Sequence, residues 1–152
     1  MTDWALRPFG TPDTDAVVLL WQRCGLTRPW NDPRRDIERK RTVQPQLFIV
    51  AEAQTQVVGS VMAGYDGHRG WINYLAVDPA WQGQGLGRAL MQQAQDALLA
   101  LGCPKINLQV RAGNTQALAF YQRLGFVQDE VLSLGKRLVE DGVPPSPVRP
   151  PG

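Results

Sequence analysis

Apolar and polar residues follow two different spacings along this chain, and the changes between them divide it into expected strands and helices. Runs rich in β-branched and aromatic residues predict strands at residues 4–9, 47–51, 57–63, 71–77 and 106–110. Apolar residues at every third or fourth position predict helices at 16–24, 85–101 and 115–124, and a cap before Pro33 predicts a polar helix at 34–41. Runs at 126–131 and 132–139 suit two final strands.

The order of these elements indicates the fold class. Short turns join the three strands between residues 47 and 77, so we expect an antiparallel meander, which strand–turn–helix units follow. The sequence therefore predicts one α+β domain at residues 1–141, with a central mixed, mostly antiparallel sheet of six to seven strands and helices on both faces. Five prolines after Gly142 predict an extended, flexible tail at 142–152.

The composition is that of an ordinary globular protein and narrows the function by exclusion. Hydrophobic residues make up 43% of the 152 and charged residues 20%, and a formal net charge of +2 gives no indication of nucleic acid or membrane binding. Cys24, Cys103 and His68 are too few for a disulfide framework or a structural metal site, so we expect reduced thiols and no metal. No apolar run approaches about 18 residues and no leader is recognisable, which favours a cytoplasmic location.

A glycine-rich turn between the strand at 71–77 and the helix at 85–101 is the strongest candidate for a ligand site. Gly83, Gly85 and Gly87 lack the Cβ atoms that would keep a ligand away from the backbone. The following helix directs unpaired N–H groups and the positive end of its dipole toward the same turn. Because glycines cost backbone entropy without adding core, their concentration here predicts a binding site for a phosphate.

Two common nucleotide motifs do not fit this turn. A P-loop requires a lysine after its last glycine, and no lysine follows Gly87. A dinucleotide fingerprint that starts at Gly83 requires its third glycine at the position of Arg88, and hairpins rather than a strand–helix–strand unit precede it. We therefore expect neither a nucleoside triphosphate nor a dinucleotide.

Two segments together resemble the GNAT family of acetyl-CoA-dependent N-acetyltransferases. Gln82-Gly-Gln-Gly-Leu-Gly87 is similar to the family's Gln/Arg-x-x-Gly-x-Gly/Ala turn. Asn114-Thr-Gln-Ala-Leu-Ala-Phe-Tyr-Gln-Arg-Leu-Gly-Phe126 is similar to its Asn-x-x-Ala-x-x-Phe/Leu-Tyr-x-x-x-Gly-Phe segment. The interval between the two has room for one helix and one strand, as in the family. The resemblance covers about residues 46–126, and the preceding residues match in layout alone.

The resemblance implies a site for acetyl-CoA, the acyl donor, where the sheet splays apart. In the family the pyrophosphate binds backbone N–H groups of the turn, and the pantetheine arm pairs like an added strand with the strand before it. Asn114 would bind the arm or act as an ordinary helix cap. The residues that the resemblance assigns to this ligand are Leu75, Ala76, Val77, Gln82, Gly83, Gln84, Gly85, Leu86, Gly87, Arg88, Asn114, Ala117 and Phe120.

Tyr121 is the catalytic residue that the resemblance implies. A tyrosine hydroxyl near the sulfur can give a proton to the departing thiolate, although an aromatic residue at this spacing can also belong to the core. We expect direct transfer, because neither Cys24 nor Cys103 has a recognisable His and acid partner for a thiol intermediate.

The general base remains open. Asn73 stands where many relatives carry a glutamate, and an amide cannot accept the proton. The alternatives are a water held by Asn73 and Tyr74, another carboxylate such as Glu52 or Asp66, or an amine that arrives neutral. The lone His68, beside glycines in a loop, is more typical of a solvated turn.

These observations predict an enzyme that transfers acetyl from acetyl-CoA to a primary amine of a small molecule or of a protein or peptide. We expect a monomer or homodimer without a membrane partner. A non-catalytic CoA-binding sensor or interaction module is the alternative, which Asn73 keeps open and Tyr121 opposes. Nucleic acid binding through the basic residues between Arg34 and Arg41 is disfavoured, because Asp36 and Glu38 interrupt them.

Overall fold

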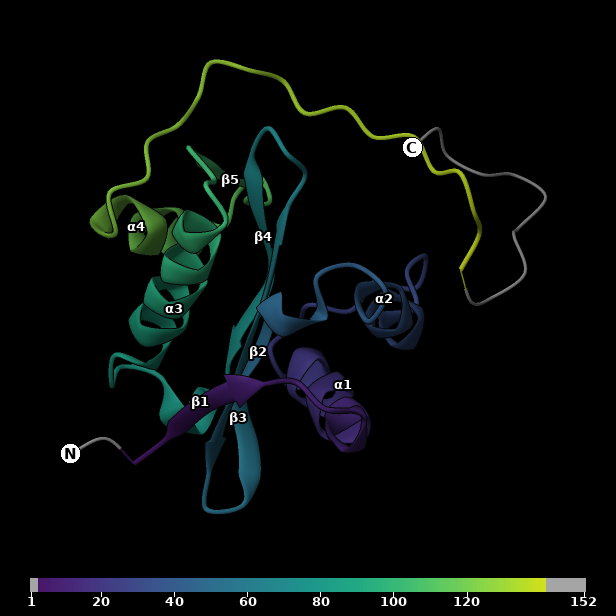
Figure 1. The fold of residues 1–152 in the computed structure, drawn as a ribbon, viewed down its shortest axis with the longest axis vertical. Coiled ribbons are helices and arrows are strands. Elements are labelled where there is room, and N and C mark those ends of the chain that lie inside the picture. The colour runs from purple at the N-terminus through teal and green to yellow at the C-terminus, as the bar shows by residue number, and fades with distance from the viewer. Residues whose placement is uncertain (1–2, 142–152) are drawn as a thin grey trace.

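The computed structural model describes residues 3–141, in which one sheet lies between two pairs of helices (Figure 1). The strands are β1 (Ala5–Pro8), β2 (Phe48–Ala53), β3 (Gln56–Tyr65), β4 (Gly70–Val77) and β5 (Ile106–Leu108). The α-helices are α1 (Thr14–Arg23), α2 (Pro33–Lys40), α3 (Leu86–Ala100) and α4 (Thr115–Arg123). Short 3-10 turns occupy Thr11–Asp13, Pro45–Leu47 and Pro79–Trp81. The predicted α+β class is confirmed, and these helices and strands lie where the sequence placed them.

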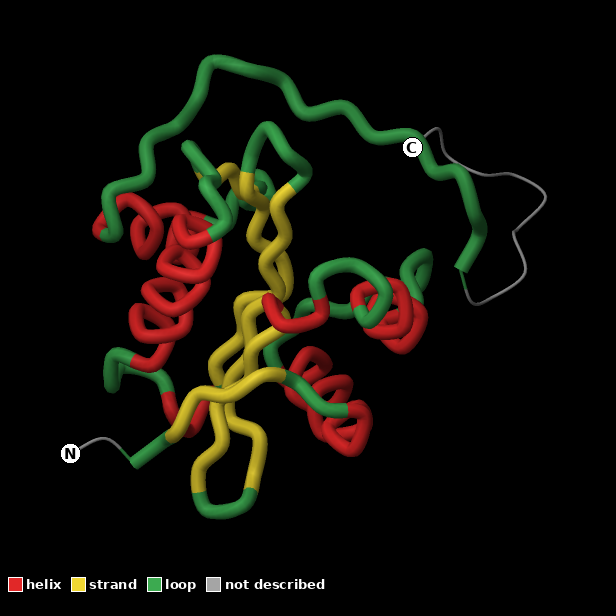
Figure 2. The backbone as a smooth tube through the Cα atoms, viewed as in Figure 1, coloured by secondary structure: helices red, strands yellow, loops and turns green. Residues whose placement is uncertain are grey.

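The sheet is mixed and mostly antiparallel, as predicted (Figure 2). Its order is β1-β2-β3-β4-β5, and every neighbouring pair is antiparallel except β4 and β5. The parallel pair follows from the chain's path, because α3 covers one face of the sheet between the two strands and returns the chain to the start of β4. The meander of β2, β3 and β4 is therefore joined to a single crossover unit.

The two strands predicted at 126–131 and 132–139 do not form, so the described sheet has five strands rather than six to seven. Beyond α4 the chain runs as an extended segment around to α2 (Figure 1). High β-propensity requires a partner edge, and β5 offers one of only three residues. The tail predicted at 142–152 lies outside the described residues. Large apolar side chains stay exposed along the extended segment, at Val127, Val131, Leu132, Leu134, Leu138 and Val139.

Two apolar layers hold the helices against opposite faces of the sheet, which confirms the prediction of helices on both faces. α3 buries residues spaced by four, Leu86, Leu90, Ala94 and Leu98, against one face. On the other face α1 packs against β3, and α2 contributes Ile37 as its main apolar residue. Within residues 3–141, no helix is long and apolar enough to cross a membrane.

The helix termini differ in how their free N–H groups are satisfied. The side chain of Asp32 accepts from the Arg34 N–H at the start of α2, and that of Asn114 accepts from the Ala117 N–H at the start of α4. At the start of α3 the N-cap is Gly85, which has no side chain to accept a hydrogen bond. α3 therefore begins with N–H donors that no capping side chain satisfies.

We predict that Leu90→Ala lowers the free energy of unfolding by about 2–5 kcal/mol, because it opens a cavity under α3. Leu90 is fully buried, whereas Leu99 on the same helix is 67% exposed. Leu99→Ala is the matched control and should change stability by less than about 0.5 kcal/mol. Urea unfolding of both variants measures the difference, and equal effects would contradict the assignment of the core face.

Candidate active site

The C-terminal part of β4, next to the glycine-rich turn, is free of strand pairing on the edge that faces away from β3. β5 pairs with β4 at Gly70, Trp71 and Ile72, and the pairing ends there. The Asp78 N–H bonds the Val58 carbonyl of β3, so by alternation the backbone groups of Leu75 and Val77 face away from β3. Leu75 and Val77 thus have no strand partner on this edge in the segment expected to bind pantetheine, although the Val77 carbonyl accepts from the Cys24 and Gln82 side chains.

The turn from β4 to α3 is shaped by glycines in conformations that other residues rarely adopt. Gly83 and Gly85 have φ angles of 79° and 85°, and a Cβ on either would meet no protein atom within 4 Å. The Gln82 side chain folds back and donates to the Val77 carbonyl at 3.2 Å. The space beside the turn is therefore bounded by backbone and open outward.

Backbone donors gather at this turn without a protein acceptor. The first backbone hydrogen bond of α3 runs from the Ala89 N–H to the Gly85 carbonyl at 3.0 Å. The N–H groups of Leu86, Gly87 and Arg88 have no acceptor among residues 3–141, since Gly85 supplies no cap. Donors at the positive end of a helix suit a phosphate or pyrophosphate.

α4 lies against the start of α3 and brings the second motif to the turn. A Cβ on Gly87 would lie 3.2 Å from the Phe120 ring, so the two helices approach closely because residue 87 has no side chain. Asn114 caps α4 at 3.1 Å from the Ala117 N–H, which confirms its capping role. The segments 75–88 and 114–121 therefore lie side by side, although binding by their individual residues remains a prediction.

Tyr121 lies between the rings of Phe120 and Phe126, in edge-to-face contact with both. Burial raises the pKa of Tyr121 to about 12, so the hydroxyl stays protonated at neutral pH. Within residues 3–141 this hydroxyl makes no hydrogen bond. A protonated phenol without a partner meets the requirement for a proton donor.

The carboxylates considered as general bases lie away from this edge. Glu52 is on β2 and pairs with Arg7 at 3.3 Å. Asp66 belongs to the turn between β3 and β4, where it accepts from the His68 and Arg69 N–H groups at 2.7 Å. That turn is at the end of β4 remote from the glycines.

The structure adds a carboxylate that the sequence pattern did not single out. Asp36 of α2 accepts a hydrogen bond of 2.6 Å from the Tyr74 hydroxyl, beside the free edge of β4. In the sequence Asp36 was one of two acidic residues that interrupt a basic run, and nothing local links it to a residue 38 positions away. The sequence signal available was the cap before Pro33, which predicts the helix that carries Asp36 but not its contact with Tyr74.

The three arginines of α2 are engaged in ion pairs. Arg34 contacts Asp15 of α1 at 2.7 Å, and Arg35 contacts Asp32 at 3.7 Å. Arg39 contacts both Asp36 and Asp141. These ion pairs show that the arginine charges of α2 belong to a solvated helix face on which they are paired. Among residues 3–141 no three His, Cys, Asp or Glu side chains gather as a metal site.

Comparison with known proteins identifies the class to which this fold and turn belong. The profile of the acetyltransferase (GNAT) family matches residues 15–126. The chain is 52% identical over 137 residues to Acetyltransferase SG1711 of Sodalis glossinidius (strain morsitans), a match that covers 90% of this chain and 96% of that protein. The chain therefore belongs to the GNAT acetyltransferase family.

Solved structures share the fold. Ard1 from Thermoplasma volcanium superposes with a TM-score of 0.75 at 27% identity, covering 83% of this chain and 84% of that one. The ribosomal-protein-S18-alanine N-acetyltransferase of Escherichia coli superposes with a TM-score of 0.70 at 26% identity, covering 83% of this chain and 79% of that one. Both likenesses extend over most of the domain.

We predict that Asp141→Asn weakens the acid dependence of stability. Hydrogen bonds from Arg39, the first at 2.6 Å, and from the Asp32 N–H lower the pKa of Asp141 from 3.8 to about 2. Because the folded protein holds the charged form, this stabilisation is present above about pH 4 and is lost as the pH falls toward about 2. Thermal unfolding between pH 6 and pH 2 should show a smaller fall in Tm for the variant.

The matched control for this experiment is Asp96→Asn on α3, whose carboxylate accepts from Gln92 of the same helix. It should follow the wild-type profile. A wild-type acid dependence in Asp141→Asn would contradict the assigned role of Asp141.

Proposed function

We propose that this protein transfers the acetyl group of acetyl-CoA directly to a primary amine. The observation that carries the proposal is that the N–H groups of Leu86, Gly87 and Arg88 have no acceptor among residues 3–141, next to the free edge of β4. A helix that begins at a glycine, where α2 and α4 begin at capping side chains, has N–H donors available for a ligand. Membership of the acetyltransferase family also supports acetyl-CoA as the acyl donor.

The two parts of the site fit the two parts of acetyl-CoA. The pyrophosphate would accept from the turn, and each charge-assisted hydrogen bond contributes about 1.5–3 kcal/mol. The pantetheine amides would pair with the backbone of Leu75 and Val77, as an added strand does. Ala76 faces β3 in this register and would support the strand rather than contact the arm by its backbone.

The chemistry requires one bond to form and one to break. The amine nitrogen attacks the thioester carbonyl, the C–N bond forms as the nitrogen gives one proton to a base, and the C–S bond breaks, so that CoA leaves as a thiolate. Tyr121 supplies the proton that this thiolate takes up. N–H groups on the free edge of β4 would stabilise the oxyanion. The reaction needs no metal.

The acceptor is proposed as a class. The Escherichia coli neighbour is named for acetylation of an alanine of a ribosomal protein, so a peptide amine belongs among the acceptors to be tried. Free amino acids, lysine side chains and polyamines complete the panel, because each presents a primary amine.

The proposal is tested by following free thiol while the protein is incubated with acetyl-CoA and this panel. Thiol release that depends on the amine supports it, and mass spectrometry of the amine identifies the product. Calorimetry with acetyl-CoA is run in parallel. Tight binding without turnover across the panel would contradict catalysis and support a CoA-binding module.

We predict that Gly85→Ala weakens acetyl-CoA binding at least about tenfold. A Cβ at this φ of 85° strains the turn that holds the N–H donors in place. Gly102→Ala is the matched control, because Gly102 ends the same helix with a φ of 86° and open space around it. Both variants should lose similar stability, and calorimetry should show the binding defect in Gly85→Ala alone. Equal affinities in the two variants would place the ligand elsewhere.

We predict that Tyr121→Phe lowers kcat about a hundredfold and leaves the affinity for acetyl-CoA unchanged, because it removes the proton donor and keeps the ring. Stability should hold, since the hydroxyl makes no hydrogen bond within residues 3–141. Tyr65→Phe, which removes a hydroxyl bonded to the Gly67 carbonyl, is the control. Steady-state kinetics separates the two effects, and a loss under about threefold would exclude Tyr121 as the acid.

A further inference from the structure

Tyr74 stands at an irregular point of β4 and has a backbone conformation that tyrosine rarely takes. β3 and β4 pair at Met62 with Asn73 and again at Ser60 with Ala76, so Tyr74 and Leu75 together oppose Val61 in a β-bulge. The φ angle of Tyr74 is 52°, in the left-handed region. Such strain persists where the surroundings hold it, and it is concentrated at functional sites.

Buried groups on the α1 side of the sheet hold Tyr74 in this conformation. Its ring stacks on Trp21, with centroids 3.7 Å apart and planes 9° apart. Ser60 Oγ donates to the Tyr74 carbonyl at 2.8 Å and accepts from Trp21 Nε1 at 2.9 Å. Trp21 and Ser60 are both fully buried, so the direction of the Tyr74 side chain is fixed.

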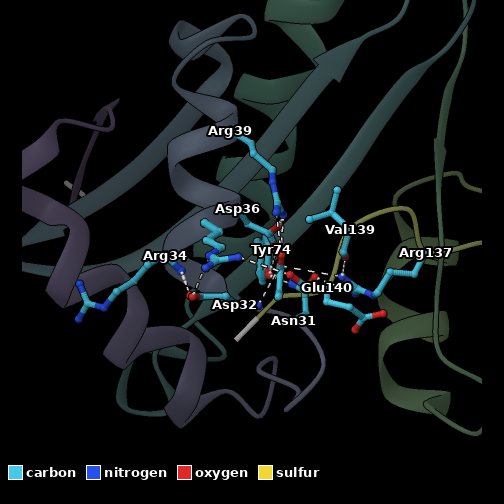
Figure 3. Close-up of polar contacts among 11 residues, drawn as sticks. Asn31, Asp32, Arg34, Asp36, Arg39, Tyr74, Arg137, Val139 and Glu140 are labelled. Carbon is cyan, nitrogen blue, oxygen red and sulfur yellow. Dashed lines mark hydrogen bonds and ion pairs between the residues drawn. The ribbon is translucent and has the colours of Figure 1, made fainter. Parts of the chain in front are cut away.

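The Tyr74 hydroxyl is directed at a carboxylate of α2 (Figure 3). It donates to Asp36 Oδ2 at 2.6 Å and accepts from Asn31 Nδ2 at 3.0 Å. Asn31 also donates to the same carboxylate oxygen. A hydroxyl that accepts from one neighbour and donates to a carboxylate is arranged to pass a proton in one direction.

On the proposed function, the reaction takes place beside this bulge. If the pyrophosphate binds at the start of α3, the arm runs back along Val77 and Leu75, and the thioester reaches β4 beside Tyr74. α3 and α4 would cover the acetyl-CoA from one side of the sheet. The amine would then approach from the side of α1 and α2, where the Tyr74 side chain lies.

We propose that Asp36 accepts the proton of the attacking amine through the Tyr74 hydroxyl, in place of the carboxylate that position 73 lacks. As the C–N bond forms, the amine N–H transfers its proton to the Tyr74 oxygen while the Tyr74 O–H transfers its own to Asp36 Oδ2. The C–S bond breaks and the CoA thiolate takes a proton from Tyr121. Tyr74 is the catalytic residue of this pair, and Asp36 acts through it.

The charged groups around Asp36 leave Oδ2 free to accept the proton from Tyr74, because Arg39 binds Oδ1. Arg39 of the same helix donates to Oδ1 at 3.2 Å, whereas Tyr74 and Asn31 bond to Oδ2. Arg39 is shared, because its second nitrogen donates to Asp141 at 2.6 Å. The guanidinium therefore orients Asp36 without neutralising it alone.

The other elements packed here add balanced charge or none. The C-terminal segment brings Asp141, and Arg137, which lies 4.0 Å from Asp141 and donates to Asn31 at 3.2 Å. α1 contributes the uncharged Trp21. β4 contributes the phenol, and burial together with the bond to Asp36 raises the pKa of Tyr74 well above its usual range. Tyr74 thus passes the proton on and does not act as a phenolate.

The test measures kcat, KM and the pH profile of three variants with an amine that the wild type acetylates. We expect Asp36→Asn and Tyr74→Phe each to lower kcat about a hundredfold with acetyl-CoA affinity unchanged. Because the two residues form one relay, the double variant should be no slower than either single one. In Asp36→Asn the proton leaves to solvent, so kcat should keep rising with pH where the wild type has levelled.

Two controls separate the relay from a structural role. Glu52→Gln makes the same chemical change on β2 and should keep wild-type kinetics. Asp96→Asn changes a carboxylate of α3, on the other face of the sheet, and should leave the pH profile as in the wild type. Asp36→Glu keeps a carboxylate and should restore part of the activity.

The outcomes distinguish the two proposals. Wild-type protein that binds acetyl-CoA but acetylates no amine overturns the proposed function and the relay with it. Active wild type with single variants within about threefold of it overturns the relay alone. Variants that lose acetyl-CoA affinity in proportion to activity, or single effects that multiply in the double variant, also overturn the relay.

Discussion

The bulge at Tyr74 is the constraint on which both sides of the site depend. β4 stays paired with β3 on one edge along its length, yet on the other edge its pairing with β5 ends at Ile72. The extra residue changes the direction of the strand just beyond that point. Leu75 and Val77 beyond it have no strand partner on that edge, and the Tyr74 side chain is directed to α2. One local distortion therefore lies between the side of β4 proposed to bind acetyl-CoA and the side from which the amine would approach.

The sheet divides these roles between its faces. α3 and α4 approach each other through the missing side chain of Gly87 and bring the glycine-rich turn to the end of β4. α1 and α2 lie on the opposite face and supply stacking and polar contacts to Tyr74. The two sides meet at β4, where Cys24 at the end of α1 also donates to the Val77 carbonyl at 3.3 Å.

Local patterns in the sequence were enough to predict the helices, the first five strands and the glycine turn. These signals are local: Pro33 and Gly85, for example, mark the starts of α2 and α3 within a few residues. The final two strands were wrong because residues 126–139 have β-propensity but no long edge to pair with. The bulge was missed because neither Gly nor Asn occupies position 74, and such residues are the usual signal of a left-handed conformation. The partnership of Tyr74 with Asp36 depends on tertiary packing and has no local signature.

The contact between Arg39 and Asp141 joins residues 102 positions apart in a chain of 152 and closes a long loop. Closing so long a loop is entropically costly until the intervening sheet has formed, so this contact belongs to the last stage of folding. During synthesis the donor side, within residues 75–121, can be complete while α2 still lacks its distal partner. A polypeptide that stops before residue 141 would retain the glycine turn, whereas Arg39 beside Asp36 would lack its bond to Asp141. The maturation of the acceptor side is thus tied to completion of the chain.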